Sequence, residues 1–229
     1  MRPGSLLLFT NKRSPSDRII KLRLTKNAND TRDLNVHYGI LCKSSEFFRS
    51  AMKPEWTRIE EQSDTLNLPV DSLDMVSDYI KWLYSDKVPI KLYELRKEDT
   101  REKAHEEAEK VSVLLARAYA FAEKIIDVKY KNGLVKTFFA AVASSGWSMG
   151  PKSVSIVYEG TPSTSPLRRF FAANVAYKAN VDSEQGVGWM QFIEAYPRDA
   201  LADAMKAMVR IRKIDWDSNP CVDAYLEKE

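Results

Sequence analysis

The sequence has few of the residues that cross-link a fold or bind a metal. Its 229 residues include 2 cysteines and 2 histidines. Cys42 and Cys221 lie far apart, and neither has a second thiol or a histidine at the spacing of a zinc site. These absences exclude a disulfide framework, predict no metal and favour a reducing compartment.

Long apolar runs and a one-sided charge are also missing. The run Leu6-Leu7-Leu8-Phe9 is far shorter than a signal-peptide core or a membrane span. The 35 basic and 32 acidic residues leave a net charge of +3, which predicts no polyanionic partner. We therefore expect an intracellular protein, cytoplasmic or nuclear, that binds neither membrane nor nucleic acid.

Catalytic patterns are equally scarce. No carboxylate pair or nucleophile–base set has a diagnostic spacing, and Gly186-Val187-Gly188 lacks the third glycine of a phosphate-binding loop. His37 lies in an apolar segment and is expected to be packed, whereas His105 and Arg168-Arg169 are expected to face solvent. An enzyme thus ranks well below a binding protein, and no cofactor or small-molecule substrate is predicted.

What is present is the patterning of a small sheet and several helices. Ile20, Leu22 and Leu24 alternate with basic residues, a turn-rich stretch follows, and residues 34–36 would return as a hairpin. Residues 65–70 alternate again and predict a third strand. Apolar residues at helical spacing predict helices that begin near residues 46, 73, 111, 128, 166 and 199.

The same patterns predict helix caps and buried helix sides. The natural caps are Ser44 or Ser45, Asp71 or Ser72, Asp127, and Ser165 before Pro166. Helical spacing turns a further group of apolar side chains inward: Val111, Leu114, Leu115, Ala118, Ala122, Ile125, Ile126, Val128, Leu134, Val135, Phe138, Phe139, Leu201, Met205, Met208 and Val209. Residues 154–162 are predicted as a short apolar segment that ends in a turn.

One segment is more informative than the rest. Residues 36–56 hold His37 in an apolar run, then Ser45, then Phe47-Phe48 in a short helical block, and a later helix closes on Leu83-Tyr84. This order resembles the BTB/POZ domain in its fungal form. Two later stretches extend the likeness, because residues 119–124 resemble a helix of that family and 156–169 resemble a segment that follows fungal BTB domains.

The resemblance implies a fold and a domain plan. The fold is α/β, a small mixed β-sheet capped by α-helices, followed by a helical C-terminal extension. A flexible tail would span residues 1–15, the BTB/POZ domain 16–146 and the extension 147–229.

The resemblance also implies a protein–protein interaction module that forms a homodimer and scaffolds other proteins. The residues expected at the self-association contact are Ile20, Leu22, Phe47, Phe48 and Met52. The leading hypothesis is a substrate adaptor for a cullin ubiquitin ligase. The alternative is an oligomerisation domain of a transcriptional or structural regulator with no ligase link.

Two departures from the family bear on this choice. Tyr38 stands where the family commonly has a basic residue that pairs with the aspartate matched by Asp17, which argues against a repressor-recruiting groove. Cullin-binding members carry a hydrophobic residue and a glutamate after the Phe-Phe helix, and Arg58 puts a cation in the carboxylate's place, although the pattern recurs three residues later. The candidate cullin contacts are Trp56, Arg58, Ile59 and Glu61.

Overall fold

Three strands form one sheet within the residues that the computed structural model describes, which are 17–27, 29–53, 65–70, 72–179 and 189–211. The strand order is β2-β1-β3, with β1–β2 antiparallel and β1–β3 parallel. The bounds are β1 (Ile19–Asn27), β2 (Asp30–His37) and β3 (Thr65–Pro69). The predicted hairpin and the predicted third strand are therefore confirmed.

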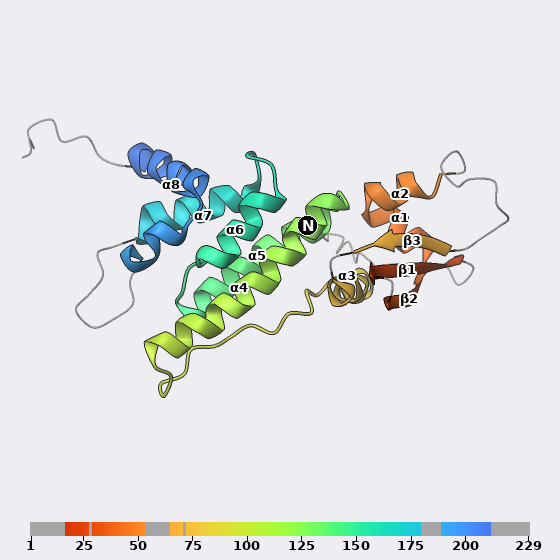
Figure 1. Cartoon of the computed structure of the whole chain (residues 1–229), viewed down its shortest axis with the longest axis horizontal. Helices are drawn as coiled ribbons and strands as arrows, with labels where there is room; N and C mark the ends of the chain where they lie inside the picture. Colours follow the sequence, from red (N-terminus) through yellow and green to blue (C-terminus); the bar gives the residue numbers. More distant parts are fainter. Residues whose placement is uncertain (1–16, 28, 54–64, 71, 180–188, 212–229) are drawn as a thin grey trace, which may run out of the picture.

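The alternation along β1 explains which face of the sheet is covered. Ile20, Leu22 and Leu24 are fully buried, whereas Arg23 between them is exposed and bonds to Asp33 of β2. Successive side chains of a strand point to opposite faces, so this pattern gives one apolar face and one polar face. Three helices lie at this end of the molecule (Figure 1): α1 (Tyr38–Ser44), α2 (Glu46–Ala51) and α3 (Leu73–Ser85).

The other end of the molecule is helical. Its elements are α4 (Arg101–Lys124), α5 (Val128–Ser145), α6 (Pro151–Gly160), α7 (Pro166–Lys178), the 3-10 helix η1 (Met190–Ala195) and α8 (Arg198–Ile211). α4 packs against both α5 and α6, and α7 packs against α8 (Figure 1). The protein thus belongs to the mixed α/β class, with a small sheet and many helices.

Buried aromatic rings join the two ends. Tyr79 of α3 is fully buried, and its ring lies 5.7 Å from Phe121 of α4, 5.1 Å from Tyr130 of α5 and 6.4 Å from Phe48 of α2. Each of these rings buries a large apolar area. Trp82 stacks on Tyr79 at 5.8 Å and extends the cluster along α3.

The predicted caps are confirmed where a backbone amide of the first turn bonds to the capping side chain. The capping residues are Ser45, Ser72, Asp127 and Ser165. These caps depend on local sequence alone, because the side-chain oxygen replaces the missing intrahelical acceptor.

The predicted short apolar segment at residues 154–162 is part of a helix, since residues 154–160 belong to α6, which Pro151 opens. Several predictions of inward side chains on the later helices are wrong. Val128, Phe139, Met205 and Val209 are 57–68% exposed, and Leu114, Ile126 and Met208 are also exposed. On α8 the small residues Ala200 and Ala204 form the buried side. The rest of the wide apolar arc of this helix therefore faces outward. No helix in the described ranges is long and apolar enough to span a membrane.

Candidate protein-interaction surfaces

The junction of α1 and α2 is anchored on the turn between α4 and α5. Ser45 is 1% exposed, and its hydroxyl donates to the carbonyl oxygen of Ile125 at 2.6 Å while accepting the amide of Phe48 at 3.2 Å. The amide of Phe47 also donates to Ile125 at 3.4 Å. The serine of the BTB-like motif therefore fixes the position of the Phe-Phe helix.

Asp127 is the second anchor of this junction. Its carboxylate is fully buried and accepts the hydroxyls of Ser44 at 2.6 Å and Tyr79 at 2.8 Å, and the amide of Tyr130 at 2.8 Å. A buried carboxylate is tolerated only with such donors. The three bonds connect α1, α3 and α5 through one side chain.

Ile126 has an unusual backbone for its residue type. Asp127 N donates to Ala122 O at 3.1 Å and Ile126 N donates to Glu123 O at 3.2 Å, the pattern of a Schellman motif at the end of α4. The φ of Ile126 is 53°, in the left-handed region where glycine is usual and a β-branched residue is strained. Its side chain is 48% exposed. The chain thus keeps an exposed isoleucine at a site that favours glycine.

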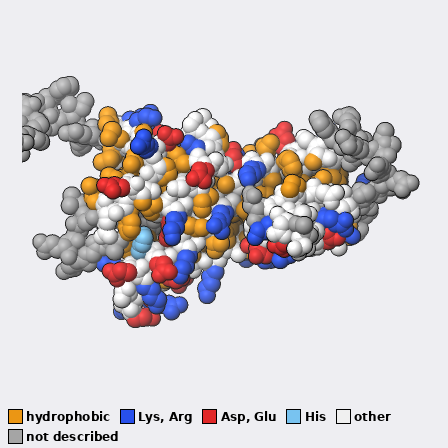
Figure 2. Space-filling view, viewed as in Figure 1, with side chains coloured by type: hydrophobic (Ala, Val, Ile, Leu, Met, Phe, Trp, Pro, Cys, Tyr) orange, Lys and Arg blue, Asp and Glu red, His pale blue; other side chains and the backbone are white. Residues whose placement is uncertain are grey.

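The α1–α2 face is the surface formed by the partly exposed side chains around this junction, namely Tyr38, Ile40, Phe47, Met52 and Ile126. Figure 2 shows hydrophobic side chains gathered at this end of the molecule. Exposed residues of both signs lie among them, because Lys43, Glu46 and Arg49 are all exposed on the same two helices.

The structure separates the five residues predicted at the self-association contact. Ile20, Leu22 and Phe48 are 0% exposed, so they belong to the core of the chain and cannot touch a second copy from its surface. The prediction that these three side chains form the contact is therefore wrong. Phe47 and Met52 are partly exposed and lie on the α1–α2 face. Self-association itself stays a prediction.

Other residues of the BTB-like pattern contact one another. Both carboxylate oxygens of Asp17 accept the amide of Gly39, at 2.9 and 3.1 Å, beside the start of α1. His37 Nδ1 lies 2.7 Å from the hydroxyl of Tyr84 at the end of α3, and the amide of His37 donates to the same hydroxyl at 3.0 Å. The histidine thus joins the end of β2 to α3.

The motif at residues 156–169 builds the joint between α6 and α7. The guanidinium of Arg168 donates to Thr161 Oγ1 at 3.1 Å and to the carbonyl oxygens of Tyr158 and Thr161, at the end of α6. A cation at the C-terminus of a helix is favourable for the helix dipole. The prediction of a solvated Arg168 is wrong, since its exposure is 9%, but Arg169 is exposed.

His105 is another correction, because it is not surrounded by solvent. Its ring stacks on Phe192 of η1 with centroids 4.7 Å apart, and Trp147 meets it edge-on at 5.1 Å. Burial lowers the pKa of His105, and the charge of Glu109 opposes that shift. Sequence reasoning missed this cluster because Phe192 comes from a distant part of the chain.

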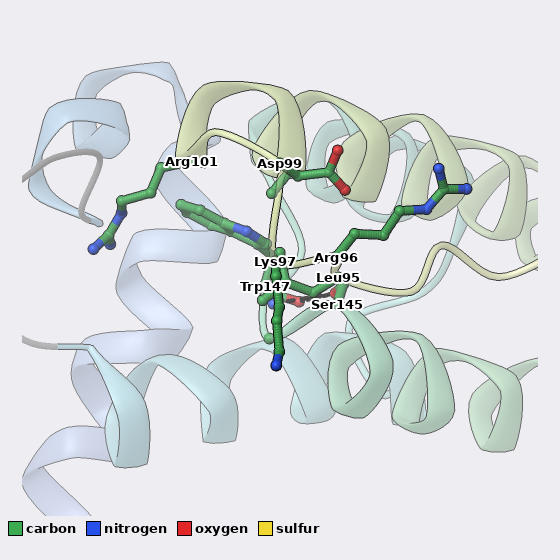
Figure 3. A pocket seen from close by; sticks show the side chains of 9 residues that line it. Leu95, Arg96, Lys97, Asp99, Arg101, Ser145 and Trp147 are labelled. Atoms are coloured by element: carbon green, nitrogen blue, oxygen red, sulfur yellow. Dashed lines mark hydrogen bonds between the residues drawn. The ribbon is translucent and has the colours of Figure 1, made fainter.

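A hollow of about 470 Å³ lies beside Trp147 and the start of α4 (Figure 3). Arg96, Lys97 and Arg101 line it, but Figure 3 shows their side chains pointing in different directions. The acidic side chain in its wall, Asp99, is already bonded to Lys103 at 2.7 Å and to the hydroxyl of Tyr93 at 2.6 Å. The hollow therefore has no converging polar groups of the kind that orient a ligand.

No group of three potential ligands within the described ranges is placed to hold a metal ion. Cys42 is buried, and burial raises the pKa of its thiol, which leaves the thiol protonated and unreactive at neutral pH. The candidate cullin contacts Trp56, Arg58, Ile59 and Glu61 lie outside the described residues, as does Cys221.

No protein-family model matches the chain, and no curated protein matches it either.

Proposed function

We propose that this protein is a BTB/POZ-type interaction module that self-associates through the α1–α2 face and scaffolds other proteins. The observation that carries the proposal is the contact between two residues of the BTB-like pattern that are far apart in the sequence, His37 and Tyr84, together with Ser45, which caps the Phe-Phe helix through the amide of Phe48. His37 and Tyr84 are 47 residues apart, so a chance likeness in sequence would give no reason for this contact.

Two features of the α1–α2 face favour a second copy of the chain as its partner. The face combines aromatic and aliphatic side chains, as homodimer interfaces do. Its exposed charges include both signs, Lys43 and Arg49 with Glu46. A two-fold interface places the same patch on both partners, so a patch of mixed charge can pair opposite signs with itself.

The strained turn at Ile126 supports the same surface. A left-handed conformation costs a non-glycine residue roughly 1–2 kcal/mol, and the side chain held in it here is 48% exposed. Strained residues cluster at functional sites because the surroundings hold them there. A contact to another copy gives the isoleucine a role that glycine would not fill.

The test is the mass of the full chain by light scattering, compared with Ile126→Gly and with Leu95→Ser as a matched change at an exposed apolar position elsewhere. We expect a dimer at micromolar concentration, a shift toward monomer for Ile126→Gly, and no shift for Leu95→Ser. A monomeric mass throughout the micromolar range contradicts self-association. If Ile126→Gly forms a dimer as stable as that of the unaltered chain, the turn at Ile126 is not part of the interface.

A further inference from the structure

One side of α8 is apolar and exposed. Leu201, Met205 and Met208 follow one another at the i, i+4 and i+7 spacing of a single helix side, and Val209 lies one turn beyond Met205. Met205, Met208 and Val209 are 68%, 46% and 67% exposed, and Leu201 is partly exposed. We call these four residues the α8 stripe.

Other residues of α8 attach the helix to the protein. Ala200 and Ala204 are almost fully buried, and α8 packs against α7. The carboxylate of Asp203 accepts the hydroxyl of Tyr158 on α6 at 3.1 Å. These contacts leave the larger apolar side chains of the helix in water. A contiguous group of exposed apolar residues marks an interaction site.

A row of charged residues runs beside the α8 stripe. Asp199, Asp203, Lys206 and Arg210 follow one another at i, i+4, i+7 and i+11, so they share one side of the helix. The two carboxylates lie in its first half and the two cations in its second half. Asp203 and Lys206 are paired with each other at 3.3 Å, whereas within the described residues no ion pair uses the exposed Asp199 or Arg210.

The order of these charges matches a second copy of α8 that runs in the opposite direction. Such a copy, related by a two-fold axis near Met205, places Leu201 beside Met208 of the second copy. It also places Asp199 beside Arg210 of the second copy, and the symmetry repeats both contacts. A parallel copy would put the two rows on opposite sides of the contact, where they meet no opposite charge. The antiparallel arrangement also orients the two helix dipoles favourably.

The charges argue against two other occupants of the α8 stripe. Arg198, the remaining charged residue of α8, lies at its first position, beyond Leu201. A helix that lies on an anionic membrane has a polar face rich in lysine and arginine, but the row beside the stripe holds as many carboxylates as cations. A peptide of one charge sign would meet like charge in one half of the row.

We propose that the α8 stripe is a second self-association contact, in which α8 pairs antiparallel with α8 of another copy. The α8 helix and the α1–α2 face lie at opposite ends of the molecule (Figure 1). Two different two-fold contacts on one chain join more than two copies. The α8 contact therefore extends the proposed dimer to a larger assembly, although its formation does not rest on the α1–α2 face.

The α8 contact is expected to be weak. A specific interface buries about 1,200–2,000 Å² in total, which is more than one stripe of four side chains on each copy provides. We therefore expect the mass of the chain to rise beyond that of a dimer only as the concentration is raised above the micromolar range.

Disulfide formation in the full chain tests the contact. Met205→Cys is combined with Cys221→Ser, and the remaining Cys42 is buried. Residue 205 lies near the axis and meets its own counterpart, and helices packed about 8–10 Å apart bring facing Cα atoms within disulfide range. Mild oxidation should therefore give a covalent dimer. Leu114→Cys with Cys221→Ser, at an exposed apolar position on α4, is the matched control and should cross-link on the order of tenfold more slowly.

Reversal of the charges tests the direction of the pairing. Asp199→Arg, added to Met205→Cys, sets a cation against Arg210 of the second copy and should slow cross-linking about fivefold, as loss of a surface ion pair does. Adding Arg210→Asp exchanges the two charges and should recover most of the rate. Both changes oppose the dipole of α8, so the recovery cannot come from a more stable helix.

The outcomes separate this contact from the alternatives. Equal rates for Met205→Cys and Leu114→Cys overturn the proposal, as does a failure of Arg210→Asp to recover the rate. Ile126→Gly should leave the cross-link unchanged, because it alters only the α1–α2 face. Met205→Glu in the native chain should abolish the rise in mass at high concentration and leave thermal unfolding at low concentration unchanged. A lower unfolding temperature with an unchanged mass would overturn the proposal and place residues 212–229 over the α8 stripe.

Discussion

Tyr79 donates its hydroxyl to the carboxylate of Asp127 at 2.8 Å, although both side chains are 0% exposed. Burial, and then the negative charge of Asp127, raise the pKa of Tyr79 far above its ordinary value, so the tyrosine remains a neutral donor. The bond links α3, which packs under the sheet, to the start of α5. It therefore ties the sheet end of the molecule to its helical end.

Removing this hydroxyl should destabilise the fold without changing its shape. Tyr79→Phe leaves the buried carboxylate with one donor fewer, which typically costs about 1–3 kcal/mol. Urea unfolding measures the loss, and Tyr177→Phe, at an exposed tyrosine, is the control with no expected change. A loss below about 0.5 kcal/mol would mean that Ser44 and the amide of Tyr130 already satisfy Asp127.

The close contact between α4 and α6 gives a second prediction. A Cβ at Gly160 would lie 2.6 Å from the Cβ of Ala120, which is far too close. Gly160→Ala should therefore push the helices apart and cost about 1–3 kcal/mol, as overpacking does. Urea unfolding should report this loss.

The same contact allows an internal control. Adding Ala120→Gly removes the opposing methyl group and should recover part of the stability lost in Gly160→Ala, although glycine within α4 costs about 1 kcal/mol by itself. A double-mutant cycle measures the coupling. Purely additive losses would show that the two residues do not oppose each other.

Asp99 predicts a dependence of stability on pH. Lys103 and then the hydroxyl of Tyr93 lower the pKa of Asp99 to about 2. Because the folded pKa lies below the unfolded value of about 3.9, the carboxylate stabilises the fold above that value and loses its contribution as the pH falls toward 2. Asp99→Asn should therefore be less stable than the native chain at pH 7, with the difference shrinking below about pH 4.

Unfolding in urea at a series of pH values measures this convergence. Glu94→Gln, at an exposed position before α4, is the matched control and should differ little from the native chain at any pH. A difference for Asp99→Asn that is constant between pH 7 and pH 3 would rule out the lowered pKa as its cause.

What the sequence predicted well is what short stretches determine. Ser45, Ser72 and Ser165 cap helices because each hydroxyl needs only the amide of its own first turn. The alternation of Ile20, Leu22 and Leu24 predicted their burial correctly, because it requires only a strand with one covered face. Periodicity could not say which side of an apolar helix a neighbour would cover, so Phe139 was expected inward and is exposed.

Residues that act through distant partners were missed for the same reason. The ring of His105 is sheltered by Phe192, and Arg168 turns onto carbonyl oxygens that α6 presents only once α6 is a helix. The sequence also did not indicate the left-handed backbone of Ile126, because this turn depends on how α4 ends against α2.

The last prediction concerns Arg58, where the native chain has a cation in place of the carboxylate that the resemblance leads us to expect in cullin-binding relatives. A cation aimed at a site suited to a carboxylate meets like charge or an unpaired donor. Disrupting one member of a buried charged contact costs about 2–5 kcal/mol, which turns sub-micromolar binding into binding too weak for assembly. We expect the native chain to bind a cullin N-terminal region weakly or not at all, and Arg58→Glu to strengthen whatever binding exists. Calorimetry measures both, with Arg117→Glu, at an exposed position on α4, as the control for net charge. Tight binding by the native chain would indicate that Glu61 supplies the carboxylate instead, and the adaptor function would then be favoured over a ligase-independent oligomer.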